Sequence, residues 1–245
     1  MTPALGPRFL LLQAIVLASY VAGTVSGFGV IVLATTLGAL LYPLDELLPV
    51  LVPTSLALTG VLVVRHRHDV DRALLFRQVL PWMGAGTAIG LALFRVAPAA
   101  RLRSAFGLVV VGLALHELRR LARRTEGRPL TRRRAVPWFL AGGVVHGLFA
   151  TGGPPLVYAF GRLGIERRPF RATLAAVWFL LNLGMTASYL AAGRVGPPQA
   201  RAIALLLPLV PAGLAIGEAV HRRIDERRFR ALVLLTLLAA GASLC

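Results

Sequence analysis

The chain has 245 residues, of which 57% are hydrophobic and 15% charged, and it carries a net charge of +17. A soluble domain of this length has about 25% charged residues, so the composition argues against a water-soluble protein and, with it, against a nucleic-acid binder, which needs a soluble basic face. The single cysteine, Cys245, excludes a disulfide framework and a thiolate metal site, and no metal or cofactor is expected.

Ten apolar segments follow one another along the chain, separated by short polar or glycine-rich breaks. The predicted helices cover residues 9–25, 30–42, 47–64, 73–94, 101–118, 135–149, 154–163, 171–192, 199–220 and 228–244. Most are long enough to cross a hydrocarbon core about 30 Å thick. The first could also be read as a secretory signal peptide over residues 8–23, but it has a counterpart later in the chain. The predicted fold class is an all-α integral membrane protein.

Two of these segments, 30–42 and 154–163, are too short to cross the membrane at about 1.5 Å per residue. Each follows a glycine-rich break, Ser26-Gly27-Phe28-Gly29 in the first half and Thr151-Gly152-Gly153-Pro154-Pro155 in the second. A pair of interrupted helices at matching places in two halves indicates the binding site of a transporter built from repeats.

An internal repeat supports this interpretation. A shift of 127 positions lays Ala85–Gly90 over Ala212–Gly217, and a shift of 120 pairs Gly23 with Gly143 and Gly27 with Gly147. We expect a first transmembrane repeat over residues 1–122, a basic cytoplasmic linker over 123–134 and a second repeat over 135–245. With five segments each, the repeats are inverted, and each contains a broken or re-entrant hairpin.

The arginines predict the orientation. All 27 basic residues are arginine, and alternation across the membrane puts 21 on one side and 6 on the other. By the positive-inside rule the richer side is cytoplasmic, and both termini lie outside a bacterial-type inner membrane.

The two breaks are the candidate anion site. A helix that begins inside the membrane has unpaired N–H groups and a partial positive charge at its N-terminus, so it attracts anions. The alternative is that these small residues only let helices pack closely. The candidates are Ser26, Gly27, Phe28, Gly29, Thr151, Gly152, Gly153 and Pro154.

Other candidates follow from their depth in the membrane. His146 and Asn182 fall near the midplane, where polar groups are costly and usually functional, although each could serve helix packing. Thr54, Ser55 and Thr59 could line the cavity or bond their own helix. Arg171 lies at the cytoplasmic entrance, where it could steer anions or only extend to the interface. Glu218 pairs with Arg222, with a proton-coupling role as the alternative.

These residues resemble a known family. The second half carries the run Gly147-x-x-x-x-Gly152-Gly153-Pro154-Pro155, followed by Phe170–Leu174, Asn182, Arg222–Asp225 and Phe229-Arg230; the first half carries Ser26–Gly29 and the Arg65–Asp71 loop. Over nearly its whole length the chain is similar to the sulfite exporter TauE/SafE family. The resemblance implies transport of sulfite, sulfonates or related sulfur compounds and does not fix the substrate. One departure is the first break, where Val30 follows Gly29 in place of a longer glycine cluster.

The resemblance also implies the partners: a small anionic substrate and the lipid bilayer, no nucleic acid, and an oligomeric state left open to a homo-oligomer. Two other functions compete with transport. An intramembrane serine hydrolase would use Ser26 with His116 or His146, but the chain lacks the spacing of a nucleophile elbow there. A scaffold that binds lipid or protein without flux is the other alternative.

Overall fold

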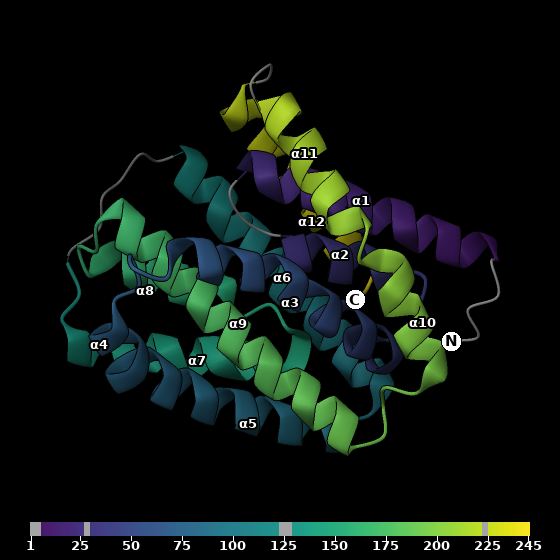
Figure 1. The fold of residues 1–245 in the computed structure, drawn as a ribbon, viewed down its shortest axis with the longest axis horizontal. Coiled ribbons are helices and arrows are strands. Elements are labelled where there is room, and N and C mark those ends of the chain that lie inside the picture. The colour runs from purple at the N-terminus through teal and green to yellow at the C-terminus, as the bar shows by residue number, and fades with distance from the viewer. Residues whose placement is uncertain (1–5, 27–29, 123–128, 222–224) are drawn as a thin grey trace. The chain divides into compact units, whose positions relative to one another are not determined.

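The computed structural model describes residues 6–26, 30–122, 129–221 and 225–245 (Figure 1). These residues are helical and contain no strand. The elements are α1 (Pro7–Ser26), α2 (Val30–Gly38), α3 (Leu44–His66), α4 (Arg72–Leu74), the π-helical turn η1 (Leu75–Val79), α5 (Leu80–Val96), α6 (Ala99–Ala122), α7 (Arg132–Phe149), α8 (Gly153–Arg162), α9 (Arg167–Ala191), α10 (Pro197–Leu206), α11 (Leu209–His221) and α12 (Glu226–Ala242).

Six helical stretches in the described chain are long and apolar enough to cross a membrane: Pro7–Val25, Leu44–His66, Arg72–Val96, Ala99–Arg119, Arg168–Ala191 and Pro197–His221. Large apolar side chains such as Val64, Leu108 and Leu232 are exposed, as suits a surface that faces lipid. The chain is therefore an all-α multi-pass membrane protein, as the sequence predicted.

Two of the long stretches are interrupted, and proline explains both interruptions. Arg72–Val96 contains η1, whose wider turn lies just before Pro81; in a regular α-helix the Pro81 ring would clash with the Arg77 carbonyl. The predicted helix 199–220 is divided into α10 and α11, because Pro208 has no N–H to continue the ladder. The predicted segment 30–42 also ends early, since α2 stops at Gly38.

The described chain forms two compact units. Unit 1 takes Met1–Thr54, Pro98–Thr125 and Ala192–Cys245, and unit 2 takes Ser55–Ala97 and Glu126–Ala191. Each unit therefore draws on both halves of the sequence. The predicted repeats over 1–122 and 135–245 describe a duplication of the sequence, whereas the two units describe which helices pack together. The repeats and their inversion stay predictions.

The same kind of helix pair holds each unit together. In unit 1, α1 packs along α11, where a Cβ on Gly213 would lie 2.5 Å from the Tyr20 Cβ and one on Gly217 2.6 Å from the Thr24 Cβ. In unit 2, α5 packs along α7, where a Cβ on Gly86 would lie 2.9 Å from the Gly143 Cα and one on Gly90 2.9 Å from the Gly147 Cα. Small residues thus bring the backbones together, as is common in membranes.

When the first three helices of the two halves are compared, their boundaries and packing correspond at an offset of 123 residues. The ends of α1 and α7 are Ser26 and Phe149, the starts of α2 and α8 are Val30 and Gly153, and the starts of α3 and α9 are Leu44 and Arg167, each pair 123 residues apart. The glycine contacts agree, because Gly143 holds the place of Tyr20 and Gly147 that of Thr24. The offset of 120, which paired Gly23 with Gly143, therefore differs from the structural correspondence by three residues.

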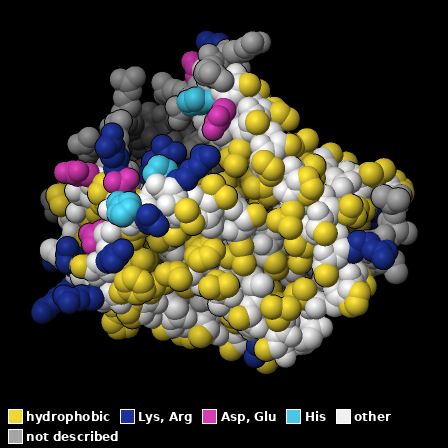
Figure 2. Space-filling view, viewed as in Figure 1, with side chains coloured by type: hydrophobic (Ala, Val, Ile, Leu, Met, Phe, Trp, Pro, Cys, Tyr) yellow, Lys and Arg dark blue, Asp and Glu magenta, His cyan; other side chains and the backbone are white. Residues whose placement is uncertain are grey.

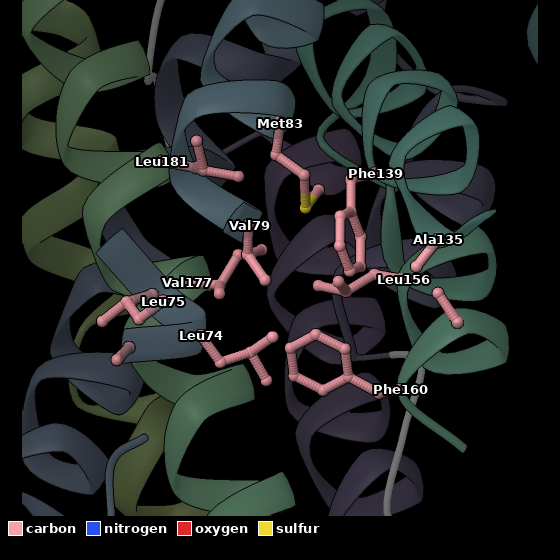
Figure 3. Packing of buried hydrophobic residues seen from close by; sticks show 12 residues of the cluster. Leu74, Leu75, Val79, Met83, Ala135, Phe139, Leu156, Phe160, Val177 and Leu181 are labelled. Carbon is pink, nitrogen blue, oxygen red and sulfur yellow. The ribbon is translucent and has the colours of Figure 1, made fainter. Parts of the chain in front are cut away.

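A hydrophobic cluster in unit 2 anchors α8 between its neighbours (Figure 3). Phe160 of α8 contacts the Phe139 ring of α7 edge-on, with ring centroids 6.1 Å apart. Leu156, one turn earlier on α8, is fully buried with Met83 of α5 and Val177 of α9. Lipid tails are as apolar as these side chains, so close van der Waals packing holds the short helix α8 in unit 2.

Most basic residues of unit 2 lie near the ends of α3 and α8 and the starts of α7 and α9, while Arg95 donates a hydrogen bond to Ser188 near the other end of α9. Two hydrogen bonds tie the basic end together: the Leu130 N–H donates to the Arg162 carbonyl at 2.9 Å, and the Asp71 N–H donates to Thr173 Oγ1 at 2.9 Å. The Arg162 guanidinium also lies 4.5 Å from the centre of the Tyr158 ring. In Figure 2 arginine and histidine side chains, with a few acidic ones among them, gather beside a largely apolar surface.

The close contact of α5 with α7 makes a stability prediction. Gly86→Ala should destabilise the folded protein by about 1–3 kcal/mol, because the new methyl group meets the Leu140 carbonyl and the Gly143 backbone. Gly84→Ala on the same helix is the matched control, since nothing lies within 4 Å of its Cβ position. Thermal unfolding in detergent measures both; equal melting temperatures for the two variants would contradict the close contact.

Candidate functional site

The junction between α7 and α8 turns sharply. Ala150 follows the last residue of α7 in the left-handed conformation, with φ of 56°, and is the one non-glycine residue with positive φ in the described chain. Its N–H donates to the His146 carbonyl at 2.7 Å. Such backbone conformations cost energy and cluster at functional sites. The turn folds Thr151 and Gly152 back onto the last turn of α7.

Helix α8 then begins at Gly153 with Gly152 as its N-cap. Pro154 and Pro155 follow in the first turn and have no N–H. Among the four backbone positions that leave a helix N-terminus unpaired, only Gly152 and Gly153 can therefore donate. Pro154 contributes shape and a fixed φ rather than a hydrogen bond.

The two glycines differ in their surroundings. A Cβ on Gly152 would meet the Gly142 carbonyl and lie 2.7 Å from the His146 Cβ, so close packing on α7 requires glycine there. A Cβ on Gly153 would lie 3.8 Å from Cζ2 of Trp178, in ordinary van der Waals contact. The packing alternative accounts for Gly152 and leaves Gly153 unexplained.

Beside this junction lies a cluster of buried polar side chains. His146 and Thr151 are each 1% exposed, Asn182 is 5% exposed and Ser55 is 8% exposed. The Asn182 Nδ2 donates to Ser55 Oγ at 3.0 Å, joining α9 to α3. Both ring nitrogens of His146, Oγ1 of Thr151 and Oδ1 of Asn182 have no hydrogen-bond partner among the described residues.

Unpartnered polar atoms in a buried place are unusual, because each costs about 1–3 kcal/mol. Native proteins pair the great majority of such atoms, and the exceptions call for a ligand, water or functional role. Here four of them come from three residues around one helix N-terminus. Thr151 Oγ1 and one His146 nitrogen can donate and Asn182 Oδ1 can only accept, so this arrangement suits a small polar ligand.

Trp178 completes the cluster. Its ring centroid lies 5.2 Å from that of His146, with the planes inclined by 31°. Trp178 and Asn182 are four residues apart on α9, so they share a face of that helix. Asn182 lies beside the imidazole and interacts with it without completing a hydrogen bond to either ring nitrogen. Trp178 was not predicted as a site residue from the sequence, although its spacing of four residues from Asn182 indicates a shared helix face.

The structure brings together six of the predicted site residues with usable side-chain or backbone groups: Ser55, His146, Thr151, Gly152, Gly153 and Asn182. Thr54 and Thr59 instead donate to their own helix, to the Val50 carbonyl at 2.7 Å and the Ser55 carbonyl at 3.1 Å. This is the alternative that the sequence left open for them. Their place in the site stays a prediction.

Arg171 is exposed near the start of α9. It precedes Asn182 by eleven residues, a rise of about 16 Å along the helix, so it is not part of the polar cluster. Ser26 ends α1, and its side chain lies outside the described residues, as do Gly27, Phe28 and Gly29 entirely. Glu218 is exposed on α11, and its expected partner Arg222 is not among the described residues.

The groups of the cluster are suited to hydrogen bonding. Within the described ranges, no group of three or more His, Cys, Asp or Glu side chains is placed to hold a metal ion. The cluster instead combines an imidazole, a hydroxyl, an amide, two backbone donors and an aromatic face.

Comparison with known proteins identifies the family. A family model described as "Sulfite exporter TauE/SafE" matches residues 11–244, almost the entire chain. No curated protein and no solved structure matches the chain. The family resemblance predicted from the glycine and proline motifs is therefore confirmed, and the chain belongs to the sulfite exporter TauE/SafE family of membrane transporters for sulfite and related anions.

Proposed function

We propose that the protein is a secondary transporter that moves a small anion, such as sulfite or an organosulfonate, and that the buried cluster of unit 2 binds this anion. The observation that carries the proposal is the set of four unpartnered polar atoms on His146, Thr151 and Asn182, next to the N-terminus of α8. An anion at this place accepts hydrogen bonds from the Thr151 hydroxyl and from one ring nitrogen of His146, whereas Asn182 Oδ1 is itself an acceptor.

The electrostatics of the cluster favour a small anion. The N-terminus of α8 presents roughly half a positive charge and the N–H groups of Gly152 and Gly153. The Thr151 hydroxyl adds a third donor. A buried arginine would be expensive to hold within the membrane, whereas these neutral donors attract the anion without that cost. Trp178 offers an apolar face beside Gly153, which suits the organic part of a sulfonate.

Alternating access by inverted repeats is the mechanism we infer for the transport cycle. Support comes from the helix boundaries, because the break between α1 and α2 holds the same place in the first half as the break between α7 and α8 in the second. On this proposal Ser26, Gly27, Phe28 and Gly29 form the counterpart tip, entering from the opposite face, and one helix bundle moves against the other around the bound anion.

The first prediction concerns Gly153. Gly153→Leu should fold and lose anion binding, because its side chain enters the space between the helix N-terminus and Trp178. Gly161→Leu is the matched control on α8, since nothing lies within 4 Å of its Cβ position. The measurements are the rise in melting temperature with sulfite or methanesulfonate and flux of labelled anion into proteoliposomes.

If folded Gly153→Leu protein binds and transports like the parent, the tip is only a packing device. Binding without flux in the parent would instead favour the scaffold. Gly152→Leu is unsuitable for this test, because its side chain collides with the Gly142 carbonyl and should disrupt the junction itself.

The second prediction concerns Asn182. Asn182→Ala should weaken anion binding by about 1–3 kcal/mol, or about 5- to 150-fold in Kd, because an amide that shapes the polar cluster is lost. Ser188→Ala on the same helix is the control, since Ser188 Oγ accepts a hydrogen bond from Arg95 at 3.0 Å and lies outside the cluster. Titration calorimetry gives both constants; equal Kd values would remove Asn182 from the site.

The third prediction concerns orientation. The arginine distribution supports a cytoplasmic position for residues 119–134 and an outside position for both termini. Cys245, the only cysteine and exposed, should react with an impermeant maleimide in intact cells. A cysteine introduced by Arg128→Cys on a Cys245→Ala background should react only after lysis. The reverse labelling pattern would overturn the orientation.

A further inference from the structure

We propose that the anion enters the cluster together with one proton, and that His146 carries this proton while the anion is bound. This inference rests on the proposed function, since it assigns a second ligand to the same site. It starts from the hydrogen-bonding capacity of the side chains around the imidazole.

Ser55 fixes the direction of the Asn182 amide. Because Nδ2 of Asn182 donates to Ser55 Oγ at 3.0 Å, its Oδ1 remains as an acceptor, and this oxygen has no partner among the described residues. Asn182 also interacts with the His146 ring. Oδ1 of Asn182 is therefore the acceptor that this amide can offer to the imidazole.

A bound anion places a second acceptor beside the same ring. Neutral imidazole has one N–H and one lone pair. It can donate a hydrogen bond to Asn182 or to the anion but not to both, and its lone pair then repels the acceptor that receives no hydrogen bond. Imidazolium has two N–H groups and can donate to Asn182 and to the anion at the same time. Binding is therefore the reaction of one anion and one proton with the neutral site, and the proton forms an N–H bond on the imidazole.

The charged surroundings make the two events depend on each other. In the described part of unit 2, the other titratable side chains on α7 and on the helices packed against it are arginines and tyrosines. They are Arg132, Arg133 and Arg134 on α7, Arg77 on η1, Arg95 on α5, Tyr158 and Arg162 on α8, and Arg168, Arg171 and Tyr189 on α9. Helix α3, which supplies Ser55, ends in Arg65 and His66.

None of those groups is a carboxylate. The carboxylates in the described part of unit 2, Asp69, Asp71 and Glu166, lie outside these helices, and Asp71 Oδ1 accepts a hydrogen bond from the Leu74 N–H. A protonated His146 therefore has no protein counter-ion on the helices packed around it. A buried charge without a partner is costly, and the bound anion supplies the partner. Proton and anion each raise the affinity of the site for the other, as thermodynamic reciprocity requires.

Trp178 supports the charged ring independently. A cation within about 6 Å of an indole face is attracted by it, and the two ring centroids are 5.2 Å apart. The indole stabilises imidazolium without adding a negative charge that would repel the anion.

Titration calorimetry of the parent protein with methanesulfonate tests the inference, because this probe does not titrate between about pH 5 and 9. Runs in two amine buffers of different ionisation enthalpy count the protons taken up; sulfonate buffers are avoided because they resemble the ligand. We expect one proton per anion and, on the alkaline side, a tenfold rise in Kd per pH unit.

His146→Gln should bind methanesulfonate with a Kd that does not depend on pH, since the amide donates without titrating. His221→Gln, which changes an exposed histidine at the end of α11, should behave as the parent. Trp178→Leu should move the pH of half-maximal binding down by about 0.4–1.5 units, and Trp178→Phe should restore most of this shift.

Binding by the parent with no net proton uptake and a flat pH profile would overturn the inference and leave the anion site intact. Proton uptake that persists in His146→Gln would assign the proton to another group and overturn it as well. If neither methanesulfonate nor sulfite binds the parent at any pH, the proposed function fails, and this inference fails with it.

Discussion

The close contact between α5 and α7 is the constraint on which the geometry of the site depends. Gly86 and Gly90 meet Gly143 and Gly147 with almost no side chain between the backbones. Because α7 is fixed in this way, its last turn and His146 have a defined position. The short helix α8 is then fixed from its other end by Leu156 and Phe160. The turn between the two helices has little freedom, which explains why it can hold Ala150 in a strained conformation.

The unpaired atoms of the polar cluster matter because the protein lies in a membrane. In water, unpaired atoms on His146, Thr151 and Asn182 would be hydrated at little cost; in the hydrocarbon core each must find a partner. A site that is neutral when empty avoids the cost of a permanent buried charge. On our proposal it gains a charge only when the ligand that balances it arrives. Neutral donors, one titratable ring and one aromatic face are sufficient for this purpose.

Much of the fold could be predicted from the sequence because apolar runs and breakers are local signals. The start and end of nearly every helix fell within about four residues of the observed position. The division at Pro208 was missed because flanking leucines mask the break. Depth counting selected His146 and Asn182, and both are buried, while their position near the midplane stays a prediction. The contact of Trp178 with His146 depends on the packing of α9. The different roles of Gly152 and Gly153 also depend on tertiary neighbours, which identical residue types cannot reveal.

The exchange of helices between the two halves has a consequence for biosynthesis. Helix α7 finds its partner α5 already made when it leaves the ribosome. Helix α1 has no such partner, because Gly213, which packs on Tyr20, is 193 residues further along the chain. At about 5–20 residues per second, the first helix waits on the order of 10–40 s for α11. The α5–α7 and α1–α11 pairs have the same kind of close contact but therefore form at very different times. The packing face of α1 needs the insertion machinery or lipid to shield it until translation is nearly complete.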